Sequence, residues 1–127
     1  MLKVYTSVDE VLVAIDLVLK NRLYVSGWLL SECLVRARRR LLMSKSCAQR
    51  CTQYKIALMF KDSLPVAVAF FDRDSSLNMM AFCRVSERRC GHASKCVQAL
   101  GIDTFSAAVG IEHSRKLWSK HSVDILW

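Results

Sequence analysis

The chain has 127 residues, of which 53% are hydrophobic, and a formal net charge of +8 from 19 basic and 11 acidic residues. This length predicts one domain with a hydrophobic core, and the apolar content excludes an intrinsically disordered chain. The basic balance favours anionic partners, such as nucleic acid, a phosphate-rich cofactor or an acidic protein surface, and does not choose among them.

The N-terminal segment does not look like a targeting signal, because Asp9, Glu10 and Asp16 interrupt its apolar pattern. No run of the sequence reaches the roughly 18 uncharged apolar residues that span a membrane. We therefore expect a cytoplasmic protein with no membrane partner, whose six cysteines are reduced thiols.

The first two expected elements are a short strand at residues 2–5 and a helix at about 7–22. Thr6 or Ser7 caps the helix, and Asp9 and Glu10, three residues further on, complete a capping box. The apolar residues of this segment recur at helical spacing, at Val8, Val11, Leu12, Ile15 and Leu19.

A second helix is predicted at about 28–44, after a break at Gly27. Its apolar face contains Leu30, Cys33, Leu34, Ala37 and Leu41. Its other sides carry most of an arginine cluster, which consists of Arg36, Arg38, Arg39 and Arg40. This cluster is interpreted as a solvated helix face or as a nucleic-acid contact. No interleaved aromatic residues support base stacking there.

Three strands follow. The apolar pattern takes a period of two at residues 54–61, which predicts a strand. Residues 66–71 are apolar on both faces, as in a central strand, and the intervening DSLP predicts a hairpin. The RDSS turn then leads to a third strand at 77–83.

Beyond Gly91 the pattern is helical again and ends at Gly101. A strand at 104–110, a helix at 111–121 and a strand at 122–127 complete the chain. The order β-α-α-β-β-β-α-β-α-β predicts an α/β (α+β) fold in one domain over residues 1–127. We expect a mixed, mainly antiparallel sheet that is flanked by helices on both faces.

The turn that enters the third helix carries the strongest indication of a binding site. Its sequence is Arg88, Arg89, Cys90, Gly91, His92, Ala93 and Ser94. A helix N-terminus offers unpaired N–H groups and the positive end of the helix dipole, and Gly91 lets a ligand approach the backbone. These features favour a phosphate group, and an ordinary solvated basic turn is the alternative. The Walker and dinucleotide glycine patterns are absent.

The segment FCRVSERRCGHASKCVQAL resembles the central motif of the GNAT acyltransferases, [RQ]-x-x-G-x-[GA], through Arg88, Gly91 and Ala93. The resemblance extends over roughly residues 50–127 and is looser for the two N-terminal helices. It implies a GNAT-like acyltransferase fold and the transfer of an acetyl group from acetyl-CoA to an amine. It also implies that the turn amides hold the coenzyme pyrophosphate, while the backbone of Met80 to Arg84 bonds the pantetheine arm. The implied cofactor-binding residues are Phe82, Cys83, Arg84, Arg88, Arg89, Cys90, Gly91, His92, Ala93 and Ser94.

The chain departs from the family at two places. Ile111 and Trp118 stand where the family often has an Asn and a Tyr that protonates the departing thiolate, and an indole is not a usable general acid. Water or the thiol of Cys83 or Cys90 is the alternative proton donor. No catalytic base is singled out among Asp72, Asp74, Glu87, Glu112 and His113. A coenzyme-binding module without turnover, or a basic nucleic-acid or protein-binding module, is the alternative function.

No metal site is expected, because Cys47, Cys51, Cys90, His92 and Cys96 lack the paired spacing of zinc ligands. The acceptor is expected to be an amine on an acidic body, since a charge of +8 repels polycations. Such an amine is a lysine or N-terminus of an acidic protein, or an aminoacyl group on RNA. The acceptor side is either open or completed by a second subunit in a homodimer.

Overall fold

The computed structural model describes residues 1–24, 29–43, 51–76, 78–87, 90–102, 105–107 and 123–125. In chain order the elements are β1 (Leu2–Ser7), α1 (Val8–Lys20), α2 (Leu29–Met43), β2 (Cys51–Lys61), β3 (Leu64–Asp72), β4 (Met79–Cys83), the 3-10 turn η2 (Val85–Glu87), α3 (His92–Ala99), β5 (Phe105–Ala107) and β6 (Val123–Ile125). Within this part of the chain, no helix is both long enough and apolar enough to cross a membrane.

The N-terminus of α1 follows the capping pattern of the sequence. Ser7 is the N-cap: its hydroxyl accepts a hydrogen bond from the Glu10 N–H, and the Glu10 carboxylate accepts one from the Ser7 N–H. These two bonds satisfy backbone donors that the helix itself leaves unpaired. The prediction of a capping box at Ser7 is confirmed.

Four strands form one antiparallel sheet in the order β1-β2-β3-β4. The predicted β2–β3 hairpin is confirmed, and its tight turn holds Asp62 and Ser63 at positive φ. β5 and β6 pair in parallel in a separate two-stranded sheet. The expectation of a mainly antiparallel sheet is thus confirmed for these four strands. Among the described residues, the parallel pair does not continue that ladder, so the expected mixed sheet is two sheets.

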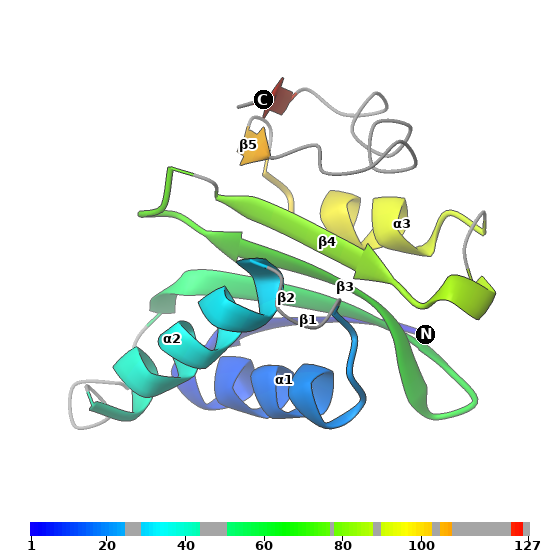
Figure 1. Cartoon of the computed structure of the whole chain (residues 1–127), viewed down its shortest axis with the longest axis horizontal. Coiled ribbons are helices and arrows are strands. Elements are labelled where there is room, and N and C mark those ends of the chain that lie inside the picture. Colours follow the sequence, from blue (N-terminus) through cyan, green and yellow to red (C-terminus); the bar gives the residue numbers. More distant parts are fainter. Residues whose placement is uncertain are drawn as a thin grey trace.

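Helices cover both faces of the four-stranded sheet, as predicted (Figure 1). The core between the sheet and α1 and α2 includes Val11, Ile15, Leu34, Ile56, Leu58, Val68 and Phe70. The core on the α3 face includes Ala57, Ala67, Ala69, Met79, Cys96, Val97 and Leu100. Alternate residues of each strand serve alternate faces, which is why both cores draw on the same strands.

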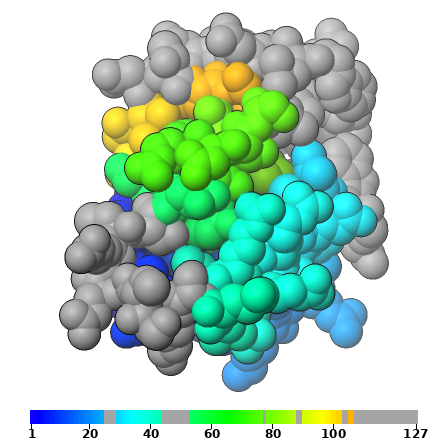
Figure 2. Space-filling model, turned by 90° about the vertical axis from the view of Figure 1, so that its left-hand side faces the viewer, coloured from blue at the N-terminus to red at the C-terminus, as the bar shows by residue number. Residues whose placement is uncertain are grey.

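β3 is buried on both faces of the sheet, by α1 and α2 on one side and by α3 on the other. Residues 65–71 are all buried, as expected for a strand that is covered on both faces. Figure 2 shows the end of the strands (green) between α2 (cyan) and β5 (orange). The Ser106 N–H of β5 donates a 2.7 Å hydrogen bond to the Asn78 side chain, just before β4 begins. β5 thus lies beside the start of β4 while belonging to the other sheet.

The predicted helix at 111–121 lies outside the described residues. The strands expected at 104–110 and 122–127 are described at Phe105–Ala107 and Val123–Ile125. The structure also contains η2, a short 3-10 turn that the sequence had not indicated.

Candidate functional site

Gly91 forms the entry to α3 in a left-handed conformation, with φ 76° and ψ 13°. The Lys95 N–H donates the first helical hydrogen bond to the Gly91 carbonyl at 3.0 Å. A Cβ placed on Gly91 would meet no atom within 4 Å. Glycine therefore suits this position because of the backbone angle, while the space beside it is open.

The N-terminus of α3 has no side-chain cap and no acidic residue in its first turn. The first-turn amides of His92 and Ala93 therefore depend on groups other than an N-cap side chain. A helix start of this kind presents N–H donors and the positive end of the dipole, a combination that suits an anion.

β4 is an edge strand, and its register determines which backbone groups face outward. The Asp72 N–H bonds to the Asn78 carbonyl, and the Arg84 N–H bonds to the Val66 carbonyl. Because bonded pairs alternate along an antiparallel ladder, the backbone of Phe82 also faces β3. The same alternation turns the backbone of Ala81 toward the outer edge. Of the strand residues predicted to bond the pantetheine arm, Ala81 and Cys83 therefore turn their backbone groups to the outer edge, whereas Phe82 does not.

The side chains at the end of β4 point to opposite faces. Phe82 packs against the core beneath α1 and α2, whereas Cys83 packs on the α3 face. The Cys83 Sγ lies 3.4 Å from the Glu87 carbonyl. Arg84 donates to the carbonyls of Asn21 and Pro65 at 3.2 and 3.4 Å, so its guanidinium ties the end of β4 to the end of α1.

The remaining predicted residues are only partly described. Cys90 is exposed, and His92, Ala93 and Ser94 are half-buried at the start of α3. The residues outside the described part are Arg88, Arg89, Ile111, Glu112, His113, Trp118 and Cys47. Their predicted roles stay predictions.

Two of the carboxylates considered as catalytic bases lie in the β3–β4 turn, at the opposite end of β4 from Gly91. Asp72 accepts hydrogen bonds from the Gln53 amide at 2.9 Å and from the Asp74 N–H at 3.1 Å. Asp74 pairs with Arg73 at 3.5 Å. Both carboxylates organise this turn and are remote from the start of α3.

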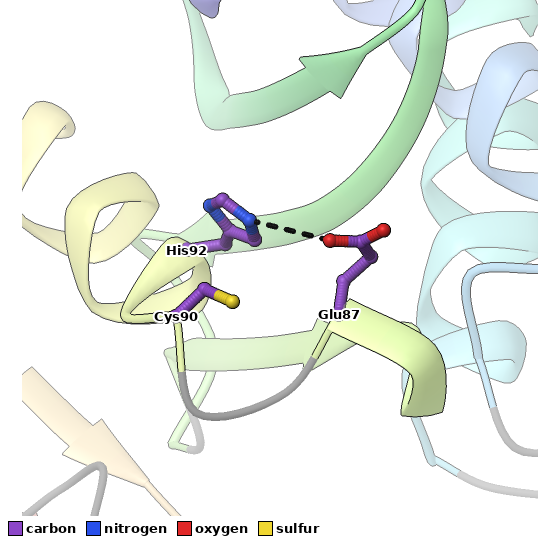
Figure 3. A group of neighbouring side chains, drawn as sticks. All are labelled: Glu87, Cys90 and His92. Atoms are coloured by element: carbon purple, nitrogen blue, oxygen red, sulfur yellow. Dashed lines mark ion pairs between the residues drawn. The ribbon is translucent and has the colours of Figure 1, made fainter.

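Glu87, Cys90 and His92 come together at the turn. A metal-ligating atom from each lies within 4.8 Å of the others, and Figure 3 shows the three side chains turned toward one another. The Lys61 ammonium contacts the Glu87 carboxylate at 3.0 and 3.2 Å, and these hydrogen bonds raise the pKa of Lys61. The spacing of the cysteines did not reveal this group, because only one of its three residues is a cysteine. The sequence did contain a sign of this group, since a glutamate, a cysteine and a histidine lie within six residues around Gly91.

The arginine cluster of α2 lies on the α1–α2 side of the sheet, across from α3. Arg38 pairs with Asp16 at 2.8 Å, and a hydrogen bond to Tyr54 raises the pKa of Arg40. Arg36 and Arg39 line an open groove of about 480 Å³ together with Leu19, Tyr24, Ser31, Glu32 and Val35. A neighbouring hollow of about 360 Å³ is lined by Val35, Arg38, Arg39, Leu42 and Met43.

The turn thus combines an outward-facing edge strand, a left-handed glycine and an uncapped helix. Of the three motif residues that resemble the GNAT acyltransferases, Gly91 and Ala93 are described and Arg88 is not. No protein-family model matches the chain, and no curated protein or solved structure matches it.

Proposed function

We propose that the chain is a GNAT-like N-acetyltransferase that moves an acetyl group from acetyl-CoA to an amine. The observation that carries this proposal is the path from edge strand β4 through left-handed Gly91 into the uncapped start of α3. The path offers backbone donors to an anion at one end. Along β4 it offers a strand edge that, among the described residues, pairs with no further strand, although β5 lies beside its start. These are the two kinds of contact that the resemblance implies for coenzyme A.

The pyrophosphate of the coenzyme is expected on the first-turn amides of His92 and Ala93. The open space beside Gly91 allows phosphate oxygens to approach the backbone. The amide groups of the pantetheine arm can pair with the outward backbone of Ala81, much as an extended peptide adds to a sheet edge. This arrangement would bring the thioester alongside β4.

The chemistry requires mainly positioning. A neutral amine attacks the thioester carbonyl, the C–N bond forms and the C–S bond breaks, and a strand N–H stabilises the oxyanion. The amine loses a proton and the coenzyme thiolate gains one. Burial raises the pKa of the Cys96 thiol to about 12, and this side chain is fully buried. Water and the Cys83 and Cys90 thiols therefore remain the alternatives for protonating the thiolate.

The acceptor is expected on an acidic body, because the chain carries a charge of +8. At low salt, turnover should be faster with an acidic protein that displays lysines than with spermine, since steering changes on-rates by roughly 10–1,000-fold. Faster turnover of spermine would show that the positive charge of the protein does not select the acceptor.

Calorimetric titration with acetyl-CoA tests the coenzyme site, and release of coenzyme thiol in the presence of amines tests turnover. Binding at micromolar concentration together with amine-dependent thiol release supports an enzyme. Binding without thiol release supports a coenzyme-binding module. No heat of binding at high micromolar coenzyme would refute both.

A second function is favoured by the groove on α2. Arg36 and Arg39 lie there beside Val35, and Leu42 and Met43 are exposed on the same helix. Basic and apolar groups side by side suit an acidic protein segment with apolar residues. The pair of substitutions Arg36→Glu and Arg39→Glu should abolish such binding and leave acetyl-CoA binding intact. Loss of both would show that the helix supports the fold or the coenzyme site.

A further inference from the structure

The atoms of the Glu87, Cys90 and His92 group are close to the spacing of a metal site. Ligand atoms around a tetrahedral Zn²⁺, with bonds of about 2.0–2.3 Å, lie roughly 3.5 Å apart. The His92 Nε2 is already 3.7 Å from the Glu87 carboxylate, and the full group falls within 4.8 Å. Cys90 is exposed, and a small change in its side-chain torsion would supply the remaining contraction.

The His92 ring is largely buried, and one of its two nitrogens has no hydrogen-bond partner in the described part of the chain. Its side chain is 19% exposed, its Nδ1 is buried with no hydrogen-bond partner, and its Nε2 lies beyond hydrogen-bond distance of Glu87. A half-buried imidazole in this condition calls for an explanation. A cation bound between Nε2 and the carboxylate would replace the long contact with Glu87 by coordination, and it would leave Nδ1 without a partner.

Lys61 pairs with the carboxylate that a metal ion would use. Its ammonium contacts both Glu87 oxygens, while its side chain remains 57% exposed. An incoming divalent cation would displace this ammonium into solvent. Lys61 therefore competes with a metal ion for the Glu87 carboxylate, and substitution of Lys61 should strengthen metal binding.

The donor set selects the class of cation. One thiolate, one imidazole and one carboxylate are unsuited to Mg²⁺ or Ca²⁺, which prefer oxygen ligands, and suit Zn²⁺ and chemically similar ions. Three protein ligands leave one position for water. Binding also deprotonates the Cys90 thiol, so it releases a proton.

We propose that Glu87, Cys90 and His92 bind a Zn²⁺-like cation that links the end of η2 to the start of α3. The three ligands come from the end of η2, the turn itself and the first residue of α3. The bound cation would thereby hold the start of α3 in one conformation. This inference does not depend on the proposed acetyltransferase activity, and it differs from the expectation of no metal.

The test is titration of the reduced, chelator-free full chain with Co²⁺, followed by absorption of the thiolate–cobalt charge-transfer band, and then displacement by Zn²⁺. We expect one cobalt per chain. Cys90→Ser should abolish the band and weaken binding at least tenfold, and Glu87→Gln should weaken binding without removing the band. Lys61→Met should tighten binding severalfold.

Cys33→Ser on α2 is the matched control, and it should bind cobalt like the unmodified chain. Circular dichroism establishes that each variant is folded, and Cys90 is a suitable target because it is exposed. A full cobalt band in Cys90→Ser would overturn the proposal. So would unchanged or weaker binding in Lys61→Met. Acetyl-CoA binding by the metal-free chain is measured separately, so either proposal can fail alone.

Discussion

The two glycines that flank α3 provide a matched pair of substitutions that separates binding from stability. Gly91 and Gly101 have φ values of 76° and 69°, and a Cβ at either position would meet nothing within 4 Å. Alanine is therefore strained by the backbone angle alone at both positions. The left-handed conformation costs an L-residue about 1–2 kcal/mol. Gly91→Ala and Gly101→Ala should lower the free energy of unfolding by similar amounts.

Binding of acetyl-CoA should respond to only one of the two substitutions. A methyl group at Gly91 stands where the pyrophosphate would approach the backbone, whereas Gly101 lies at the other end of α3. Losing good contact between amides and a charged phosphate costs about 1.5–3 kcal/mol, or about 10–150-fold in Kd. Gly101→Ala should leave Kd unchanged.

Calorimetry gives the two affinities, and urea unfolding gives the two stabilities. A third variant, Gly91→Asn, strengthens the comparison because asparagine tolerates positive φ better than alanine. It should recover part of the stability and still bind acetyl-CoA weakly. Wild-type affinity in Gly91→Ala would refute the proposed site. Equal weakening by both alanine variants would show that strain, and not contact, controls binding.

Three further predictions concern the edge strand, the cap of α1 and the buried thiol. Ala81→Pro removes an outward N–H group that does not bond to β3. The circular dichroism spectrum should therefore remain unchanged, while the affinity for acetyl-CoA falls about fivefold. Unchanged affinity would contradict a role for this edge. Ser7→Ala should lower the free energy of unfolding by about 1 kcal/mol in urea, because it removes the hydroxyl that accepts from the Glu10 N–H; no loss would mean that the cap contributes nothing. Burial raises the pKa of Cys96 from 9.0 in the unfolded chain to about 12. The contribution of Cys96 to the free energy of unfolding is therefore complete below pH 9. It falls as the pH rises toward 12, by up to about 1.4 kcal/mol per pH unit. Cys96→Val should show a shallower decline over that range, and identical pH profiles would contradict this assignment.

Local patterns in the sequence were sufficient for most of the elements. The capping box at Ser7 and Glu10 depends on residues three apart, and the hairpin at DSLP depends on one short turn. The apolar residues of β3 predicted a strand covered on both faces, which is what the structure contains. Each of these features is encoded within a few residues, so periodicity and turn chemistry reveal it.

Tertiary structure decided how those elements meet. Pairing of β5 with β6 in a second sheet depends on segments far apart in the chain, and no local pattern expresses it. The ladder between β3 and β4 determines that the backbone of Ala81, unlike that of Phe82, faces away from β3. A shift by one residue would reverse this choice without altering the composition of the strand.

The side chains around the turn show the same division between local and long-range information. The sequence indicated a helix start after Gly91 and therefore a place for an anion. It did not indicate that Arg84 reaches the carbonyl of Asn21, or that Lys61 pairs with Glu87 beside His92. These contacts join residues that are brought together by the sheet and by the bend of the backbone at η2. The packing of the folded chain determines which side chains pair between segments that are far apart in the sequence. The sequence pattern indicates which way a residue faces, but it does not indicate which residue it contacts.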